Sequence, residues 1–596
     1  MAADTPESLL DSRSEFDRAK TLLGRVLRDH AASVRALTEG VLSIYGSRAF
    51  IAGWSITLAR GEVEESFHVL VDEEFPYSKI RVAYKTRDMY LTWPHVEGAG
   101  LLCLPEHSPP SLDIEQAAVD ALSDSLILVE HCQNPDFVAQ ELGREFRSYW
   151  GYSKDRDADR VRSLLDTTNR TTRKVAVWYG KRFTLVGENA DQLISWLTNI
   201  GGSTKKSDID EGLFAYLASA PVYPFPQRPN DLFNLLRQSA PGAMEVLGRL
   251  PILTDLAVVL AASSETGDGQ VALSIKRPGK FAGFRKTNQL NAAGKLALWG
   301  TQSELKRSVV ERFDAPWVHG RGVNAELPRL RESRVLVLGC GSLGSQVASR
   351  LAQAGVGSLT LIDPEDLAAA NVGRHELGVD SAGKNKAARL GGELREKYPH
   401  AVEIEAYGVD WQQAYEKKPE LFEEASLIVA CIGEWGPDGQ LGEWLVRQKE
   451  SKRVVFGWLD EYGVACHALA LGSGIPALSC VLNAEGSLRI PETKWPGETL
   501  MQVEPACGTL FQPYGSVDVA QGQVLVSRLC IDLLIGKTQA PCHRVYAAST
   551  SQIKEAGGEW SAQHLEHRPA GFDGAFIYER PVARCGQCAA CVKNAT

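Results

Sequence analysis

The sequence predicts a multidomain α/β protein, and three observations support this fold class. The chain has 596 residues, which at about 150 residues per domain corresponds to three or four domains. Short apolar runs separated by turn residues between positions 48 and 90 are typical of an antiparallel meander. From about residue 316, short apolar strands alternate with helical patterns, which predicts a doubly wound parallel sheet.

The N-terminal region, residues 1–155, has three parts. Apolar residues at helical spacing in 8–42 predict one or two amphipathic helices before the meander, and the same spacing returns in 114–150. Residues 156–315 form a connecting domain of mixed structure. In it we expect strands within 174–187, a helix at 190–200 and a proline-rich loop, but no catalytic constellation.

Composition excludes several classes of function. The chain has 64 basic and 74 acidic residues, a net charge of −10, which argues against nucleic-acid binding as its main task. Its first residues have no basic and apolar leader, and no apolar run is long enough to span a membrane. We therefore expect a cytoplasmic protein whose 12 cysteines are reduced thiols in the core, metal ligands or nucleophiles.

The C-terminal region, residues 316–596, carries a phosphate-binding motif. Gly339, Gly341 and Gly344 lie between a predicted strand at 334–338 and a predicted helix at 343–354. Glycines at this turn let the backbone approach a phosphate, which the N-terminus of the helix then attracts. An acidic residue that ends the next strand, Asp363, is placed to bind ribose hydroxyls. The motif predicts a site for an adenine nucleotide.

The residues after Asp363 indicate which nucleotide chemistry is involved. Glu365, Asn371, Arg374 and Lys386 follow within one short stretch. A hydride-transfer enzyme has no use for an arginine and a lysine here. An enzyme that directs attack on the α-phosphate of ATP does, because negative charge builds on that phosphate as pyrophosphate leaves.

This block resembles the ThiF/MoeB and ubiquitin-activating adenylation domains in the order and spacing of its residues, over roughly residues 310–596. The resemblance implies ATP, magnesium and a homodimer. In the family an aspartate that helps to hold magnesium follows the fourth strand, where this chain has Gly433, and Glu434 or Asp438 are the candidate substitutes. The implied nucleotide ligands are Asp363 for the ribose, Asn371 and Arg374 for the phosphates and Lys386 for the α-phosphate, with Glu365 beside them.

Two cysteines are candidates to accept the activated acyl group as a thioester. A catalytic thiol needs a helix N-terminus or a cation nearby to lower its pKa. Cys507 precedes a long helical stretch at 517–535, where the resembled family has a catalytic cysteine in a crossover loop. Cys542 is followed by His543 and Arg544, but it begins a predicted strand. We favour Cys507 and keep Cys542 as the alternative.

The last cysteines of the chain have the spacing of a zinc site. Cys585, Cys588 and Cys591 form a CxxCxxC pattern, and tetrahedral zinc needs a fourth ligand. Adenylation domains of the resembled family often pair a C-terminal CxxC with a cysteine in the middle of the domain. We therefore predict Cys480 as the fourth ligand, while a reduced, solvent-facing tail remains the other interpretation.

The N-terminal region resembles the ubiquitin-conjugating fold: a helix, a four-stranded meander, a strip containing proline, a cysteine and further helices. The cysteine is Cys103, and the strip reads Trp93-Pro94-His95. The family has His-Pro-Asn, so His95 occupies the position of the asparagine, eight residues before the cysteine. An imidazole can donate to an oxyanion or act as a base.

An activating and a conjugating domain in one chain resemble the bacterial fusion proteins of CBASS antiphage operons. That resemblance implies that the C-terminus of a CD-NTase, or of a ubiquitin-like protein, passes from an adenylate through thioesters to a lysine on a target. Arg374, Lys386, His95 and the cysteines Cys103 and Cys507 or Cys542 are then catalytic. Two alternatives are a nucleotide-binding scaffold with an inactive conjugating fold and the activation of a sulfur carrier.

Overall fold

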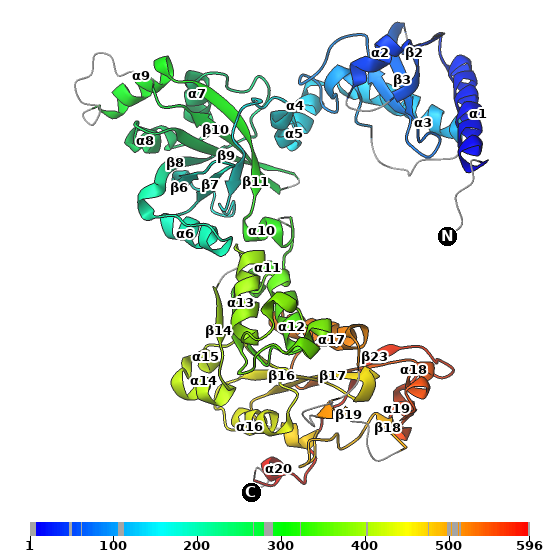
Figure 1. Cartoon of the computed structure of the whole chain (residues 1–596). Helices are drawn as coiled ribbons and strands as arrows, with labels where there is room; N and C mark the ends of the chain where they lie inside the picture. The colour runs from blue at the N-terminus through cyan, green and yellow to red at the C-terminus, as the bar shows by residue number, and fades with distance from the viewer. Residues whose placement is uncertain are drawn as a thin grey trace. The chain divides into compact units, whose positions relative to one another are not determined.

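The computed structural model describes most of the chain (Figure 1). The described residues are 7–46, 50–60, 62–104, 113–265, 267–278, 290–321, 323–400, 403–474, 476–496, 502–503, 510–511 and 514–593. They form two compact units. The first comprises Met1–Val161, Thr167–Val175 and Glu211–Val310, and the second comprises Arg162–Asp166, Ala176–Asp210 and Glu311–Thr596.

An antiparallel sheet lies at the centre of the N-terminal region, as the meander predicts. Its strand order is β1-β2-β3-β4, and helices α1 and α3 contribute to the same apolar core. The elements are α1 (Glu7–His30), β1 (Ser33–Ala36), α2 (Glu39–Leu42), β2 (Phe50–Arg60), β3 (Val63–Asp72), β4 (Arg81–Tyr84), α3 (Ile114–His131), α4 (Pro135–Arg144) and α5 (Phe146–Tyr152).

The helical prediction for 8–42 is wrong at β1. Ser33–Ala36 is an edge strand that pairs with residues 54–57 of β2. Three of its four side chains are exposed, and Val34 is only half-buried. A half-exposed edge strand of four residues shows too little apolar alternation to be distinguished from the end of a helix.

The connecting region contains a closed barrel, an architecture that the sequence left open. Its strand order is β10-β11-β5-β7-β6-β8-β9. The strands are β5 (Val161–Ser163), β6 (Arg173–Tyr179), β7 (Thr184–Gly187), β8 (Ile209–Tyr216), β9 (Leu256–Ser264), β10 (Gly267–Ile275) and β11 (Leu305–Arg312). The same region contains the helices α6 (Ala190–Asn199), α7 (Pro229–Ser239), α8 (Ala243–Arg249) and α9 (Ala292–Gln302). The strands in 174–187 and the helix at 190–200 are therefore confirmed.

The second unit is built on an eight-stranded sheet with the order β14-β13-β12-β15-β16-β17-β21-β23. The first five strands are parallel and the last three antiparallel. They are β12 (Arg334–Leu338), β13 (Ser358–Ile362), β14 (Glu403–Tyr407), β15 (Leu427–Ala430), β16 (Arg453–Leu459), β17 (Ala465–Gly472), β21 (Cys542–Ala547) and β23 (Phe576–Arg580).

Helices cover both faces of this sheet because its central strands are apolar on both sides. Val335 and Val337 of β12 belong to a core with α12, α13 and α17, whereas Leu336 and Leu338 belong to a second core with α14 and α16. Figure 1 shows the two groups of helices on opposite sides of the sheet. They are α12 (Gly344–Ala354), α13 (Lys386–Lys397), α14 (Trp411–Lys417), α16 (Trp435–Val446) and α17 (Ser516–Leu534). This is the predicted doubly wound arrangement.

Shorter elements complete the second unit. They include α10 (Ala315–Val318), α11 (Leu327–Arg331), α15 (Glu420–Glu423), β18 (Thr493–Lys494), β19 (Gln502–Val503), β20 (Leu510–Phe511), α18 (Thr550–Glu555), β22 (Glu559–Trp560), α19 (Ala562–His567) and α20 (Ala589–Lys593). Among the described residues, no helix is both long and apolar enough to cross a membrane.

Candidate functional site

The glycine loop after β12 has a backbone that side chains would disrupt. Gly339 has φ +83°, and a Cβ there would lie 2.6 Å from the carbonyl oxygen of Cys431. A Cβ on Gly344 would lie 1.9 Å from the carbonyl oxygen of Gly339. At Gly341 the same position is open. Two glycines are therefore required by the turn, and the third leaves room for a ligand to approach the backbone.

Asp363 follows β13 and is buried against this loop. Its Oδ2 accepts a hydrogen bond from the backbone N–H of Cys340 at 2.6 Å, and its Oδ1 accepts one from Glu365 at 2.8 Å. Burial raises the pKa of the carboxyl group, although these two N–H donors and Lys386 act against that shift. The carboxylate thus braces the glycine loop, and ribose binding stays a prediction for it.

Lys386 begins α13 with its side chain almost fully buried. Its ammonium forms an ion pair with the exposed carboxylate of Glu365. The preceding residue, Asn385, caps the helix by accepting from the N–H of Ala388 at 3.0 Å and donates to the carbonyl oxygen of Asp363 at 2.9 Å. Sequence reasoning missed Asn385, although an asparagine directly before a helix is a recognisable cap.

Asn371 and Arg374 lie together on a 3₁₀ helix, Ala369–Arg374. The side chain of Asn371 accepts from the N–H of Ala368 at 3.2 Å, and Arg374 donates to the carbonyl oxygen of Ala370 at 2.9 Å. The guanidinium of Arg374 also lies 5.4 Å from the ring centre of Tyr514. The hydroxyl of Tyr514 is in turn 3.0 Å from the hydroxyl of Ser342 in the glycine loop.

His375 is a second residue that the sequence did not single out. Its buried ring donates through Nε2 to the carbonyl oxygen of Cys340 at 2.6 Å and accepts from the N–H of Leu377 through Nδ1 at 3.0 Å. These two bonds fit the neutral tautomer with the proton on Nε2. Burial lowers the pKa of His375, which also favours the neutral ring. The ring and Asp363 therefore both hold the backbone of Cys340 in the glycine loop.

The cation site predicted beside β15 retains one suitable carboxylate. Gly433 follows the strand with φ +79°. Asp438 lies in the first turn of α16, and its buried Oδ1 has no hydrogen-bond partner among the described residues. Burial, and after it the charge of Glu434, raises the pKa of Asp438 to about 7. A bound cation would supply the missing partner, so Asp438 fits a magnesium ligand.

Of the two candidate thioester cysteines of the second unit, Cys507 lies outside the described residues. Cys542 begins β21, is buried and pairs with Ala470 of β17. Burial, followed by the charge of Glu579, raises the pKa of its thiol. A thiol in this environment is poorly activated as a nucleophile.

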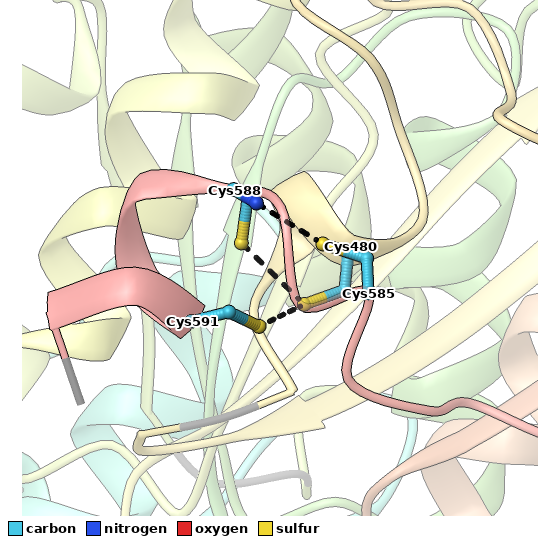
Figure 2. Close-up of side chains that lie close together, drawn as sticks. All are labelled: Cys480, Cys585, Cys588 and Cys591. Carbon is cyan, nitrogen blue, oxygen red and sulfur yellow. Dashed lines mark hydrogen bonds between the residues drawn. The ribbon is translucent and has the colours of Figure 1, made fainter. Parts of the chain in front are cut away.

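The four cysteines of the predicted zinc site come together (Figure 2). Their sulfur atoms all lie within 4.8 Å of one another. Cys480 Sγ is 3.7 Å from Cys588 Sγ and 3.5 Å from Cys591 Sγ. Tetrahedral zinc with bonds of about 2.3 Å places its sulfur ligands about 3.8 Å apart, whereas a disulfide needs about 2 Å. The four thiols therefore fit one zinc ion.

In the first unit, Cys103 is exposed and follows a short antiparallel pair. Its backbone N–H donates to the carbonyl oxygen of His95 at 2.8 Å, next to the bridge between Val96 and Leu102. His95 has φ +58°. Asparagine and histidine both occur in this left-handed conformation more often than most residues. The backbone at this position thus tolerates either residue.

Three side chains of α4, α5 and their junction hold His95. Its backbone N–H donates to the hydroxyl of Tyr149 at 2.8 Å. Its ring Nε2 is 3.2 Å from Glu141 Oε2, and its Nδ1 is 3.8 Å from Glu145 Oε2. Sequence reasoning missed all three partners. Their spacing of four residues predicts that they share one face of a helical stretch. That spacing does not predict that this face contacts His95.

Comparison with known proteins identifies both kinds of domain. Residues 321–446 match the model of the ThiF family, and residues 30–158 match that of prokaryotic E2 family B. The chain therefore joins a prokaryotic E2-like domain to a ThiF-type domain with the Rossmann-like sheet described above.

Individual relatives cover only parts of the chain. The "ATP-dependent ubiquitin transferase-like protein Cap2" of Pseudomonas aeruginosa is 32% identical over 145 residues, 24% of this chain and 25% of the relative. The mouse "adenylyltransferase and sulfurtransferase MOCS3" is 44% identical over 87 residues, 14% of this chain and 18% of the relative. These matches thus span a quarter or less of each relative.

Among solved structures, E. coli MccB with AMPCPP and MccA is 16% identical with a TM-score of 0.31, over 45% of this chain and 68% of MccB.

Proposed function

We propose that this chain uses ATP to activate the C-terminal carboxylate of a partner protein and transfers it through cysteine thioesters to an amine. The observation that carries the proposal is the buried constellation at the glycine loop. Asp363 and His375 hold the loop, and Lys386 presents a buried ammonium that pairs with the exposed carboxylate of Glu365. A negatively charged phosphate that displaces Glu365 would bind this ammonium strongly.

In the first step, an oxygen of the partner's carboxylate attacks the α-phosphate of ATP and pyrophosphate leaves. Lys386 stabilises the charge that builds on the α-phosphate, and Arg374 and Asn371 bind the outgoing phosphates. Two interactions are ones that a nucleotide can replace. They are the ion pair of Lys386 with the exposed carboxylate of Glu365 and the cation–π contact of Arg374 with Tyr514. The product is a mixed anhydride whose carbonyl carbon is electrophilic.

In the second step, the Cys507 thiolate takes the acyl group and AMP leaves. The Cys103 thiolate then attacks this thioester, so that Cys507 is released as a thiolate. An amine, such as a lysine of a target protein, finally attacks the thioester on Cys103 to form an amide. The buried, poorly activated thiol of Cys542 favours Cys507 as the first acceptor.

Two metal ions have separate roles in the proposal. Asp438 would help to hold magnesium beside the nucleotide, where the ion neutralises phosphate charge. Cys480, Cys585, Cys588 and Cys591 would hold zinc, which closes the C-terminal end of the unit and takes no part in the reaction because a site with four protein ligands has no open position.

The partner that we propose is a CD-NTase or a ubiquitin-like protein, recognised through its C-terminus, and the active form is a homodimer in the cytoplasm. The match to Cap2, whose name describes an ATP-dependent ubiquitin transferase-like protein, supports this choice. The match to MOCS3 would equally support activation of a sulfur carrier. An E2-like domain favours ligation, because sulfur transfer needs no aminolysis step. A scaffold that only binds nucleotide would not need the exposed Cys103.

A trapping experiment tests the proposal. In the native host, tagged Cys103→Ser protein is expressed together with the products of neighbouring genes. The serine holds the acyl group as an oxyester, which reacts more slowly with amines than a thioester does. We expect intact mass and peptide mapping to find a protein joined through its C-terminal residue to Ser at position 103.

Matched variants connect the adduct to the adenylation site. The adduct should disappear with Lys386→Ala and with Cys507→Ala, and it should persist with Lys384→Ala, which removes an exposed lysine two residues away. Loss with Cys542→Ala but not with Cys507→Ala would assign the first thioester to Cys542. Absence of any adduct from a chain that still binds ATP would contradict the proposed ligation and favour the scaffold.

A further inference from the structure

The contacts of His95 supply what the last step of the proposed function needs. An amine that attacks a thioester acquires positive charge, and it must lose a proton before the thiolate leaves. A base close to the thioester carbon makes this loss fast. The backbone N–H of Cys103 donates a hydrogen bond to the carbonyl oxygen of His95 across a short antiparallel pair. The His95 side chain is 21% exposed. The backbones of the two residues therefore lie side by side, and the ring is partly accessible to an incoming amine.

The ring is held in one orientation by Glu141. A carboxylate accepts hydrogen bonds, so the 3.2 Å contact with Nε2 requires the ring proton on that nitrogen. In the neutral ring Nδ1 then keeps its lone pair and can accept a proton. Glu141 is itself fixed, because its side chain is only 13% exposed and Arg144 donates to its other oxygen at 3.4 Å. Arg144 also offsets part of its charge.

Glu145 complements this arrangement from a longer distance. Its Oε2 is 3.8 Å from Nδ1, which is too long for a hydrogen bond but close enough to stabilise the ring once it is protonated. Burial, and after it the charges of Glu97, Cys103 and Glu145, raises the pKa of the nearby Tyr152. Other titratable groups around the ring and its partners include Arg144, Tyr149 and Cys132.

We propose that Glu141 is the positioning residue that turns His95 into the general base for aminolysis at Cys103. Nδ1 of His95 takes the proton of the attacking amine, the C–N bond forms, and the C–S bond breaks to release the Cys103 thiolate. The imidazolium then returns its proton to that thiolate or to solvent. This inference rests on the proposed ligation function, but it concerns a step that needs no ATP.

A test that bypasses adenylation separates the two claims. The purified full chain is incubated with a short peptide thioester ending in glycine, which loads Cys103 by thiol exchange. After the donor is removed, free lysine is added, and loss of the acyl group from Cys103 is followed by intact mass and peptide mapping between pH 6 and 9. The variants are Glu141→Gln, His95→Gln and, as matched control, Glu130→Gln, which changes an exposed carboxylate of α3.

We expect Glu141→Gln to slow lysine transfer by about tenfold or more, within the range of general base catalysis, while Cys103 loads at the wild-type rate. His95→Gln should be slower still, and Glu130→Gln should match the wild type.

Three results would overturn the inference. They are a transfer rate of Glu141→Gln within twofold of the wild type, an equal loss of loading and transfer, which would indicate a purely structural role, and failure of the loaded wild-type chain to transfer to lysine. None of these results depends on Lys386, so an adduct in the trapping experiment would still support the proposed function.

Discussion

Glu492 shows how a single buried carboxylate organises the C-terminal part of the second unit. Its side chain is 2% exposed and contacts three groups: His564 Nδ1 at 3.1 Å, the hydroxyl of Tyr578 and the guanidinium of Arg580. The ring of His564 is stacked on Trp560 at 4.1 Å. Burial by itself raises the pKa of Glu492, but its three partners outweigh this and lower the pKa from 4.5 to about 2.

This lowered pKa predicts a pH dependence of stability. The carboxylate stabilises the native state fully above about pH 4.5, and this contribution is lost as the pH falls toward 2. The shift corresponds to about 3 kcal/mol. Glu492→Gln should therefore lower the thermal midpoint at pH 7 by several degrees and reduce its decline between pH 5 and 3. An unchanged decline, or the same effect from the exposed control Glu555→Gln, would contradict this assignment.

At the level of residues, the sequence predicts groups that recur in motifs and misses those that support them. Gly339, Gly344 and Asp363 are recognisable because the turn and the acid have fixed spacing. His375 and Glu141 act through a contact with a backbone carbonyl or a ring that lies far away along the chain. No local pattern encodes such contacts, so the structure was needed to find them.

At the level of elements, the cysteine cluster joins two pieces that are too short to be stable alone. Cys480 belongs to a 3₁₀ turn, Leu478–Cys480, and Cys591 to the five-residue helix α20. Helices of this length are marginal in water. Among the described residues, the apolar cluster at this site is small and consists largely of the cysteines themselves. A metal ion would supply the free energy that fixes the C-terminal segment.

Zinc analysis of the purified chain tests this role. We expect about one zinc ion per chain by elemental mass spectrometry, and loss of that ion in Cys588→Ser. Chelation should release the C-terminal segment to protease cleavage before the rest of the unit unfolds. Cys542→Ala, which changes a buried cysteine outside the cluster, should retain the ion. Absence of zinc from freshly purified protein whose four cysteines are reduced would contradict the metal site.

Element prediction succeeded where periodicity was strong and failed where it was weak. The parallel strands and helices of the second unit are apolar on faces that match their period, as β12 shows. The edge strand Ser33–Ala36 and the closure of the barrel left no such signal, because closure depends on pairing between strands that are far apart along the chain.

For the whole molecule, the proposed relay connects sites that belong to different compact units. Lys386 and the glycine loop lie in the second unit, and Cys103 lies in the first. An acyl group formed at the loop must therefore pass from one unit to the other, within one chain or between the two chains of the proposed dimer. This requirement makes the adenylation step and the thioester on Cys103 separable, so each can be measured without the other.

ATP–pyrophosphate exchange, with the protein recovered from the Cys103→Ser trap, tests the central claim most directly. The account predicts exchange that depends on the intact C-terminus of that protein, persists in Cys103→Ser and Lys384→Ala, and falls at least a hundredfold in Lys386→Ala. Exchange that continues after the C-terminal residue of the partner is deleted, or that is unaffected by Lys386→Ala, would contradict adenylation of a partner carboxylate at the glycine loop.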